Sequence, residues 1–339
     1  MASNDLISII IPVKNEKNRI RTIIDGLYRQ TYRPIEVIFV DGDSTDGTVE
    51  EIMNVIREYS SDDFRVRLLK ERDFGSIRSP ANARNIGALN ASGKYIAFFD
   101  ADFDLREDPE VLNKAISMLK LGYKRVDIQI IPNMHTWIEK NIVLDDIFHY
   151  GKGRSFKLNR YCCFDKELFI KILFDTNLGI FEDIDMINRL EKIYRDKAII
   201  DTKIRFCWPH TMKSYLRQQF WYGKTIIRYL RKYNLSVSKH TIRINATLGL
   251  LLLALFFLYY VPLFSATLLI LMFILIYNRW LRDDLHFLDK EAELMRSNRF
   301  FTLLSRMAWH LFREILARSS YDAGLLIYLL KRGKVRPGR

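Results

Sequence analysis

Short, almost continuous apolar runs alternate with segments of helical spacing over the first hundred residues of the chain. Such runs are typical of parallel strands that are covered on both faces. Between them, apolar residues recur every three or four positions, which is the spacing of an amphipathic helix. The predicted strands are 6–13, 35–40, 66–69 and 95–99, and the predicted helices are 20–28, 49–56 and 79–90.

This order predicts the fold class α/β, with a doubly wound and mostly parallel sheet. Ligands of such a sheet bind at the carboxyl ends of the strands. Asp41 follows the second predicted strand and Asp100 follows the fourth, so these acidic residues mark the expected site. The later pattern is less regular, with a helix near 110–119, a strand near 126–131 and a helix that opens at 182–183.

The basic charge of the chain is confined to its last third. Residues 1–211 carry 32 Lys and Arg against 33 Asp and Glu, net −1, whereas residues 212–339 carry 21 against 7, net +14. The same last third holds the longest apolar run, which favours an anionic membrane over nucleic acid as the partner. Three cysteines, Cys162, Cys163 and Cys207, form neither a disulfide framework nor a paired zinc spacing and indicate a reducing compartment.

Residues 246–277 contain no charged side chain and are interrupted only by Pro262. The run is too long for one straight span of about 20 residues, and with flanking residues it gives two spans. Basic segments on both sides favour two spans by the positive-inside rule, with the N-terminal domain in the cytoplasm. A shallow re-entrant hairpin is the alternative. Residues 213–233 precede it as an amphipathic helix with basic and large apolar residues, typical of the membrane interface.

Three carboxylates follow the fourth predicted strand at alternate positions: Asp100, Asp102 and Asp104. Carboxylates two residues apart on an extended segment point to the same side. Hard oxygen ligands of this kind hold a divalent cation, which neutralises the leaving group of a nucleotide-diphosphate sugar. The segment therefore predicts a metal and nucleotide site rather than an ordinary acidic loop.

Five stretches of the chain, in the order of a known family, fall between about residues 6 and 223: Ser8–Glu16, Val40–Thr48, Ala83–Gly87, Asp100–Asp102 and Phe181–Asp183. In them the chain resembles the inverting family 2 glycosyltransferases of the GT-A fold. The resemblance implies a GT-A catalytic domain at 1–211. After this domain, the pattern of charge and apolar spacing predicts an interfacial helix at 212–241, a transmembrane hairpin at 242–282, and amphipathic helices with a basic tail at 283–339.

The resemblance also implies roles for single residues on the donor side. Pro12 and Glu16 resemble positions that line the nucleotide pocket, and Asp41 resembles the carboxylate that accepts from the base. Arg84 resembles a residue near the diphosphate, where a guanidinium is a good anion partner. Asp100 resembles a contact to the ribose or to a metal-bound water.

Three further residues are assigned to metal binding by the resemblance: Asp102 as the direct ligand of Mn²⁺ or Mg²⁺, with Asp104 and His210 as additional ligands. Asp183 resembles the catalytic base, and an inverting transfer needs one such base. Glu182 and Asp185 either raise the pKa of Asp183 or cap the helix.

Two features depart from the family pattern. The usual Asp-Asp-Gly-Ser is here Asp41-Gly-Asp43-Ser44, so the second acidic side chain is expected to point elsewhere. The segment Gln218–Gly223 lacks the Gln-x-x-Arg-Trp signature of processive synthases, which favours transfer of a single sugar.

The expected partners are a nucleotide-diphosphate sugar donor and a membrane lipid acceptor, either a polyprenyl phosphate or a lipid-linked glycan. A homo-oligomer that pairs through the C-terminal helices stays open. Two other functions compete. A nucleotidyltransferase would want a glycine in the loop Val13–Lys17, which has none, and a catalytically silent membrane partner would not need Asp100, Asp102 and Asp183.

Overall fold

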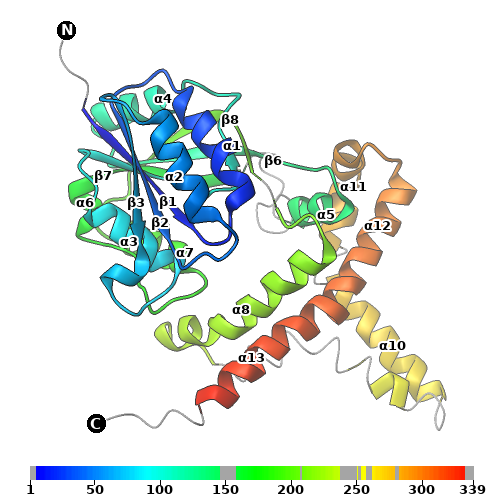
Figure 1. The fold of residues 1–339 in the computed structure, drawn as a ribbon. Coiled ribbons are helices and arrows are strands. Elements are labelled where there is room, and N and C mark those ends of the chain that lie inside the picture. Colours follow the sequence, from blue (N-terminus) through cyan, green and yellow to red (C-terminus); the bar gives the residue numbers. More distant parts are fainter. Residues whose placement is uncertain are drawn as a thin grey trace. The chain divides into compact units, whose positions relative to one another are not determined.

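In the computed structural model, the described residues are 5–145, 158–206, 208–236, 250, 253–256, 262–278 and 282–332. The chain divides into two compact units (Figure 1). Unit 1 comprises Met1–Asn133 and Lys157–Cys207, and unit 2 comprises Met134–Phe156 and Trp208–Arg339. Residues 134–145, which the sequence analysis assigned to the first domain, thus belong to the second unit.

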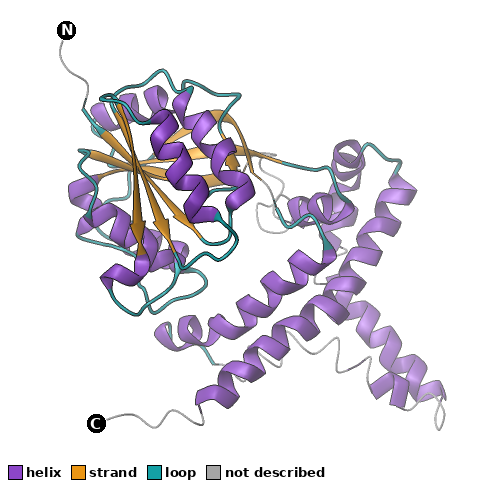
Figure 2. Ribbon diagram, in the orientation of Figure 1, coloured by secondary structure: helices purple, strands orange, loops and turns teal. Residues whose placement is uncertain are grey.

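The strands of unit 1 are orange in Figure 2. In the described residues of this unit they form an eight-stranded mixed sheet with the order β3-β2-β1-β4-β7-β6-β8-β5. The first four strands in this order lie parallel: β3 (Phe64–Lys70), β2 (Ile35–Asp41), β1 (Ile7–Val13) and β4 (Tyr95–Phe98). All of β2 is buried, as is all of β1 except Pro12. The prediction of covered parallel strands is confirmed for this half of the sheet.

The other half of the sheet is mixed. β7 (Leu158–Asp165) lies antiparallel to β4 and to β6 (Arg125–Pro132). β8 (Ala198–Phe206) is parallel to β6 and antiparallel to the short β5 (Phe103–Asp104). The sequence analysis predicted β6 but neither β7 nor β8. β8 alternates polar and apolar residues, which is the pattern of a strand covered on one face and was not used in the prediction. In β7, Leu158 is followed by the polar residues Asn159 and Arg160.

Helices cover both faces of this sheet (Figure 1). Alternate residues of β1, such as Ile9, share one core with α1 (Lys17–Tyr28), α2 (Thr48–Tyr59) and α4 (Val111–Lys120). Ile10 points to the opposite face and shares a core with α3 (Pro80–Leu89), α6 (Lys166–Ile170) and α7 (Glu182–Leu190). A 3₁₀ turn, η1 (Glu71–Phe74), follows β3. The arrangement is the doubly wound α/β sheet that the sequence predicted.

The described part of unit 2 is helical: α5 (Trp137–Leu144), α8 (Met212–Lys232), α10 (Pro262–Ile276), α11 (Arg282–Met295), α12 (Arg299–Phe312), the π-helical η4 (Arg313–Ala317) and α13 (Arg318–Arg332). The predicted helix at 213–233 is therefore present as α8. Its position at a membrane interface stays a prediction.

Much of the predicted hairpin at 242–282 lies outside the described residues, namely 242–249, 251–252, 257–261 and 279–281. Among the residues that are described, none of the helices combines the length and the apolar character that crossing a membrane requires. The two-span hairpin and its re-entrant alternative both remain predictions.

Helices α8 and α13 run side by side (Figure 1) and meet at two glycines. A Cβ added to Gly223 would lie 1.8 Å from the carbonyl oxygen of Tyr321, and one added to Gly324 would lie 2.0 Å from that of Phe220. Both obstacles are backbone atoms, so a side chain at either position forces the helices apart. Ser320 adds a bond from its hydroxyl to the carbonyl of Leu216, at 2.7 Å.

Substitution Gly324→Val is expected to destabilise unit 2, because the added side chain overlaps the backbone of α8. Overpacking of this kind costs about 1–3 kcal/mol. Thermal unfolding of the purified protein measures the loss. Ala323→Val is the matched control, since Ala323 is exposed on the same helix. Equal melting temperatures for the two variants would contradict the close packing.

Candidate active site at the carboxyl ends of the parallel strands

The loops that follow β1 and β2 are tied together by side-chain bonds to backbone groups. The amide of Asn15 donates to Ser44 Oγ at 2.9 Å, and Asn15 Oδ1 accepts from the amide of Thr45 at 2.8 Å. The amide of Glu16 donates to Thr48 Oγ1, also at 2.9 Å. These bonds fix the strand ends where Pro12, Glu16 and Asp41 were expected to line a nucleotide pocket.

Asp41 ends β2 and is buried, with 3% of its surface exposed. Its two carboxylate oxygens accept from the amide of Ser44 at 3.2 and 3.3 Å. It lines a cleft of about 530 Å³ whose walls are polar and carry both acidic and basic side chains. The other lining residues are Asp43, Ser44, Thr45, Gly47, Val49, Glu50, Lys70, Arg72 and Arg78. A carboxylate at the base of a polar cleft can accept from a ligand N–H. Pro12 is half-buried in β1 and pairs with Val40 of β2.

Asp43 lines this same cleft, although the sequence analysis expected its side chain to point elsewhere. Its backbone is left-handed, with φ of 62°, so the chain turns at this residue and side-chain alternation no longer applies. The carboxylate accepts from Arg78 Nε at 2.7 Å, and this bond lowers the pKa of Asp43. The cleft thus contains an ion pair that the sequence did not predict.

The segment after β4 is a turn rather than an extended strand. The amide of Phe103 donates to the carbonyl of Asp100 at 3.1 Å, and β5 begins only at Phe103. The prediction that Asp100, Asp102 and Asp104 share one side of an extended segment is therefore wrong. Asp104 lies beyond the turn and binds Arg106 with both carboxylate oxygens, at 2.9 Å to Nε and 2.7 Å to Nη2.

Asp102 lies within the turn and has a buried oxygen, Oδ1, for which the described residues provide no hydrogen-bond partner. Burial, together with the neighbouring charges of Asp100 and Glu16, raises the pKa of Asp102 to about 7, while Arg19 opposes this increase. Burial also raises the pKa of Glu16. Arg19 lowers this pKa, and the charge of Asp100 raises it. Three carboxylates from two strand ends therefore repel one another.

These residues fit a divalent cation, because a cation would pair with the buried Oδ1 and relieve the repulsion. Among the described residues, no three His, Cys, Asp or Glu side chains form a group that could hold a metal alone. Mg²⁺ in proteins is commonly bound by one or two carboxylates together with substrate phosphates. Asp102 and Asp100 have the carboxylate chemistry that such a shared site requires.

The two additional ligands expected from the sequence have different surroundings. Asp104 is engaged by Arg106, which lowers the pKa of its carboxyl. His210 is exposed and belongs to unit 2, whereas Asp102 belongs to unit 1. Their roles as metal ligands remain predictions.

Arg84 links two parts of the site. Its guanidinium donates from Nη2 to Asp100 Oδ1 at 2.7 Å and from Nη1 to Glu182 Oε1 at 3.2 Å. The side chain is 8% exposed and lies over the ring of Phe174. The sequence assigned Arg84 to an anionic ligand, and the structure shows that it also holds two protein carboxylates.

Helix α3 is in turn fixed by its neighbours in the stretch Ala83–Gly87. Asn85 makes reciprocal bonds of 2.9 Å with the backbone of Phe174, in the loop that leads to α7. Gly87 packs on β1, where an added Cβ would lie 2.4 Å from Ile10 Cγ2. These contacts hold Arg84 between β4 and α7.

Asp183 lies in the first turn of α7, next to Glu182. Asp183 is half-buried, and its Oδ1 accepts from the amide of Ile184 at 2.8 Å. Burial raises the pKa of Glu182, the contact with Arg84 opposes this, and Asp183 adds to it. Asp185 is fully buried and pairs with Arg189 Nε at 2.9 Å, so its role is structural.

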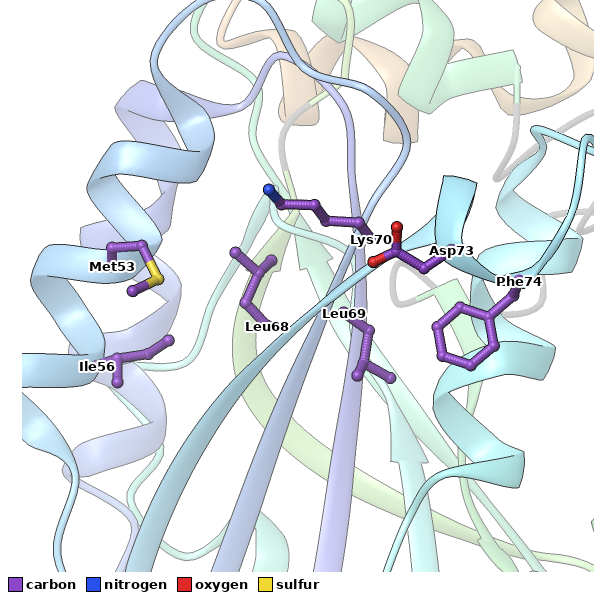
Figure 3. A pocket seen from close by; sticks show the side chains of 7 residues that line it. All are labelled: Met53, Ile56, Leu68, Leu69, Lys70, Asp73 and Phe74. Atoms are coloured by element: carbon purple, nitrogen blue, oxygen red, sulfur yellow. The ribbon is translucent and has the colours of Figure 1, made fainter.

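A second cleft, of about 430 Å³, lies at the β3 edge of the sheet and contains none of the predicted site residues (Figure 3). Its walls are Met53, Ile56, Leu68, Leu69, Lys70, Asp73 and Phe74. The cleft is mostly apolar, so it offers few groups that could recognise a polar ligand.

Sequence reasoning missed three contributors to the site: Arg19, which opposes the pKa increases of Glu16 and Asp102, and the pair Asp43–Arg78. Arg19 is three residues after Glu16, one helical turn away, and that spacing was the available signal. Arg78 is 35 residues from Asp43, so no local pattern could have joined them.

The family described as Glycosyl transferase family 2 matches residues 8–160 of the chain. The uncharacterized glycosyltransferase EpsJ of Bacillus subtilis is 37% identical over an alignment of 242 positions, and the match covers 63% of this chain and 67% of EpsJ. Glycosyltransferase GlyA of Streptococcus pneumoniae is 35% identical over 117 residues, 34% of this chain. The chain spans only 14% to 27% of the length of GlyA and two other curated relatives.

Among solved structures, the fold is similar to that of the mannosyltransferase PcManGT from Pyrobaculum calidifontis, solved with GDP-Man and Mn²⁺. The TM-score is 0.56 at 16% identity, and the match covers 98% of this chain and 89% of the other. This likeness concerns the fold and supports the GT-A type of sheet.

Proposed function

The chain belongs to glycosyltransferase family 2, and from this premise we propose that it transfers a single sugar from a nucleotide-diphosphate sugar to a membrane lipid acceptor. The observation that carries the proposal is the position of Asp102. Its buried Oδ1 lies beside Asp100 at the carboxyl end of β4, and Arg84 connects Asp100 to the start of α7.

The donor would lie along the ends of β1 and β2. Asp41 is buried at the base of a polar cleft and is suited to accept from a base N–H. Pro12 and Glu16 flank the same strand ends. Lys70 and Arg72 of this cleft could pair with a diphosphate, whereas Arg78 already pairs with Asp43. PcManGT was solved with a nucleotide sugar and Mn²⁺, which supports the same class of donor and cation.

Asp102, with Asp100, would hold Mn²⁺ or Mg²⁺ together with the diphosphate oxygens of the donor. The cation supplies charge neutralisation as the nucleoside diphosphate leaves. Arg84 orients Asp100 and Glu182 through its two short contacts, and Arg19 limits the repulsion at Glu16 and Asp102.

Asp183 would act as the base of an inverting transfer. With a hydroxyl acceptor it would take the proton while the hydroxyl oxygen attacks the anomeric carbon on the face opposite the leaving nucleotide. One base suffices, since inversion needs no covalent sugar intermediate. NMR of the product reports the anomeric configuration, and a product with the configuration of the donor would contradict this mechanism.

The acceptor is proposed to be a polyprenyl phosphate or a lipid-linked glycan, since a lipid acceptor favours an enzyme attached to the same membrane. The net charge of +14 in residues 212–339 and the apolar run at 246–277 support integral attachment. Basic segments on both sides of that run support a catalytic unit on the cytoplasmic side.

Substitution Arg84→Lys is expected to slow transfer while changing the KM for the donor little. One ammonium cannot reproduce both guanidinium contacts, and a bond to a charged group contributes about 2 kcal/mol. That corresponds to about thirtyfold in kcat. Steady-state kinetics separate kcat from KM. A raised KM at unchanged kcat would instead support the direct diphosphate contact that the sequence analysis assigned to Arg84.

Phase partition of a radiolabelled sugar tests the class of acceptor. The protein in detergent is given a labelled donor with a polyprenyl phosphate, a lipid-linked glycan or a soluble sugar. Label that enters the organic phase with either lipid supports the proposal and identifies the acceptor. Transfer to the soluble sugar alone would contradict a lipid acceptor.

A further inference from the structure

Helix α12 is amphipathic, but its polar side is buried and its apolar side is exposed, which is the reverse of a helix on the surface of a water-soluble domain. Its buried side carries polar and charged residues together with a tryptophan, and all four are 0% exposed: Thr302, Arg306, Trp309 and His310. Its outer side is apolar, and the exposed residues there are Phe300, Phe301, Leu304, Met307 and Leu311. They recur at helical spacing, so they form one continuous stripe, which we name the α12 stripe.

The buried side of α12 is held by an ion network centred on Arg306. Nη2 of Arg306 lies 2.7 Å from Asp145 Oδ1, at the end of α5, and 2.9 Å from Asp284 Oδ1 of α11. Nη1 donates to the carbonyl and to Oδ1 of Asn141, each at 3.1 Å. Nε lies 3.6 Å from Glu291 Oε2.

The neighbours of Arg306 on α12 join the same network. Trp309 Nε1 donates to Asp145 Oδ2 at 2.8 Å, and His310 Nε2 lies 2.6 Å from Asp284 Oδ2. Arg313 also pairs with Asp145. Rotation of α12 would leave several of these buried charges without partners, at a cost of several kcal/mol. The network therefore fixes which side of α12 faces outward.

The α12 stripe is consequently held in an exposed position by its own unit. Phe300 and Phe301 are 65% and 61% exposed, which is unusual for adjacent aromatic residues. Large exposed apolar patches mark interaction surfaces. Helices with paired polar groups on the inner side and apolar residues on the outer side are typical of proteins in contact with lipid.

We infer that the α12 stripe lies in the interfacial layer of an anionic phospholipid bilayer. The inference extends the membrane attachment proposed above by assigning it to an element outside the predicted hairpin. Charge complementarity favours lipid as the occupant, since residues 212–339 carry net +14. Arg296 and Arg299 are exposed at the start of α12, where they can reach phosphate groups. Residues 1–211 carry net −1, so they offer the basic helices little electrostatic attraction.

Fluorescence quenching by spin-labelled lipid tests this inference on the full chain. The three cysteines are replaced by alanine, and Leu304→Cys, Met307→Cys and the control Glu293→Cys are each labelled with an environment-sensitive dye. Glu293 is exposed on the adjacent α11. The protein is reconstituted in phosphatidylglycerol vesicles with nitroxide near the headgroup, since an interfacial helix enters about 5–10 Å.

Loss of fluorescence at positions 304 and 307, with little loss at 293, is the expected result. Quenching of 304 and 307 by aqueous iodide rather than by lipid would overturn the inference, because the stripe would then face water. Shielding from both quenchers would also overturn it and would indicate cover by unit 1 or a second copy. Sugar transfer is assayed separately, so failure of the lipid acceptor and failure of this surface are distinguishable.

Discussion

Substitution Asp102→Ala is expected to abolish both sugar transfer and metal-dependent binding of the nucleotide. Oδ1 of Asp102 is buried and has no described partner within the protein. Alanine removes this oxygen, so the cation would lose its proposed direct ligand. Metal stabilisation of the transition state contributes several kcal/mol, which corresponds to a loss of about 10³-fold. Calorimetric titration with nucleoside diphosphate, with and without Mn²⁺, measures the binding.

Glu107→Gln is the matched control for Asp102→Ala. Glu107 follows the same turn, is largely exposed and contacts Arg205 rather than the acidic group. The Glu107→Gln variant should bind the nucleotide and transfer the sugar like the unsubstituted protein. Mn²⁺-dependent nucleotide binding that persists in Asp102→Ala would remove Asp102 from the metal site.

Substitution Asp183→Asn is expected to abolish transfer while leaving donor binding unchanged. The amide keeps the shape and still accepts from Ile184, but it cannot take a proton. Loss of a general base reduces the rate by about 10²–10⁴-fold. The measurements are single-turnover transfer and donor affinity in the same preparation.

The control for Asp183→Asn is Glu191→Gln, at the other end of α7, where the carboxylate contacts Arg125. Transfer at the normal rate by Asp183→Asn would refute the role of Asp183 as base. A parallel loss of donor affinity would indicate a binding role instead.

The parallel half of the sheet could be predicted because buried strands require continuous apolar runs, and 6–13 and 35–40 are such runs. β8 was not predicted because it is no continuous apolar run; it alternates apolar residues with polar ones such as Asp201, which is the pattern of a strand covered on one face. The mixed strand order depends on long-range pairing, which a local pattern does not encode.

At the site, the sequence located Asp100 and Asp102 correctly at a strand end but not the turn that directs Asp104 toward Arg106. Turn geometry depends on backbone angles, as the left-handed Asp43 also shows. The bond between Arg84 and Glu182 joins residues 98 positions apart, so only the fold reveals it. In α12, the spacing predicted an amphipathic helix. That its polar side is the buried one follows only from the partners of Arg306 on other segments.

The most direct test of the proposed function is turnover of a panel of UDP- and GDP-sugars by the purified protein in detergent, with Mn²⁺, with Mg²⁺ and with EDTA, in the presence of polyprenyl phosphate or of a lipid-linked glycan. We predict that one donor is consumed only with metal and that its sugar appears on one of the two lipids. If every donor remains intact and unbound with metal present, the chain is not a nucleotide-sugar-dependent transferase, and the roles proposed for Asp102 and Asp183 fail with it.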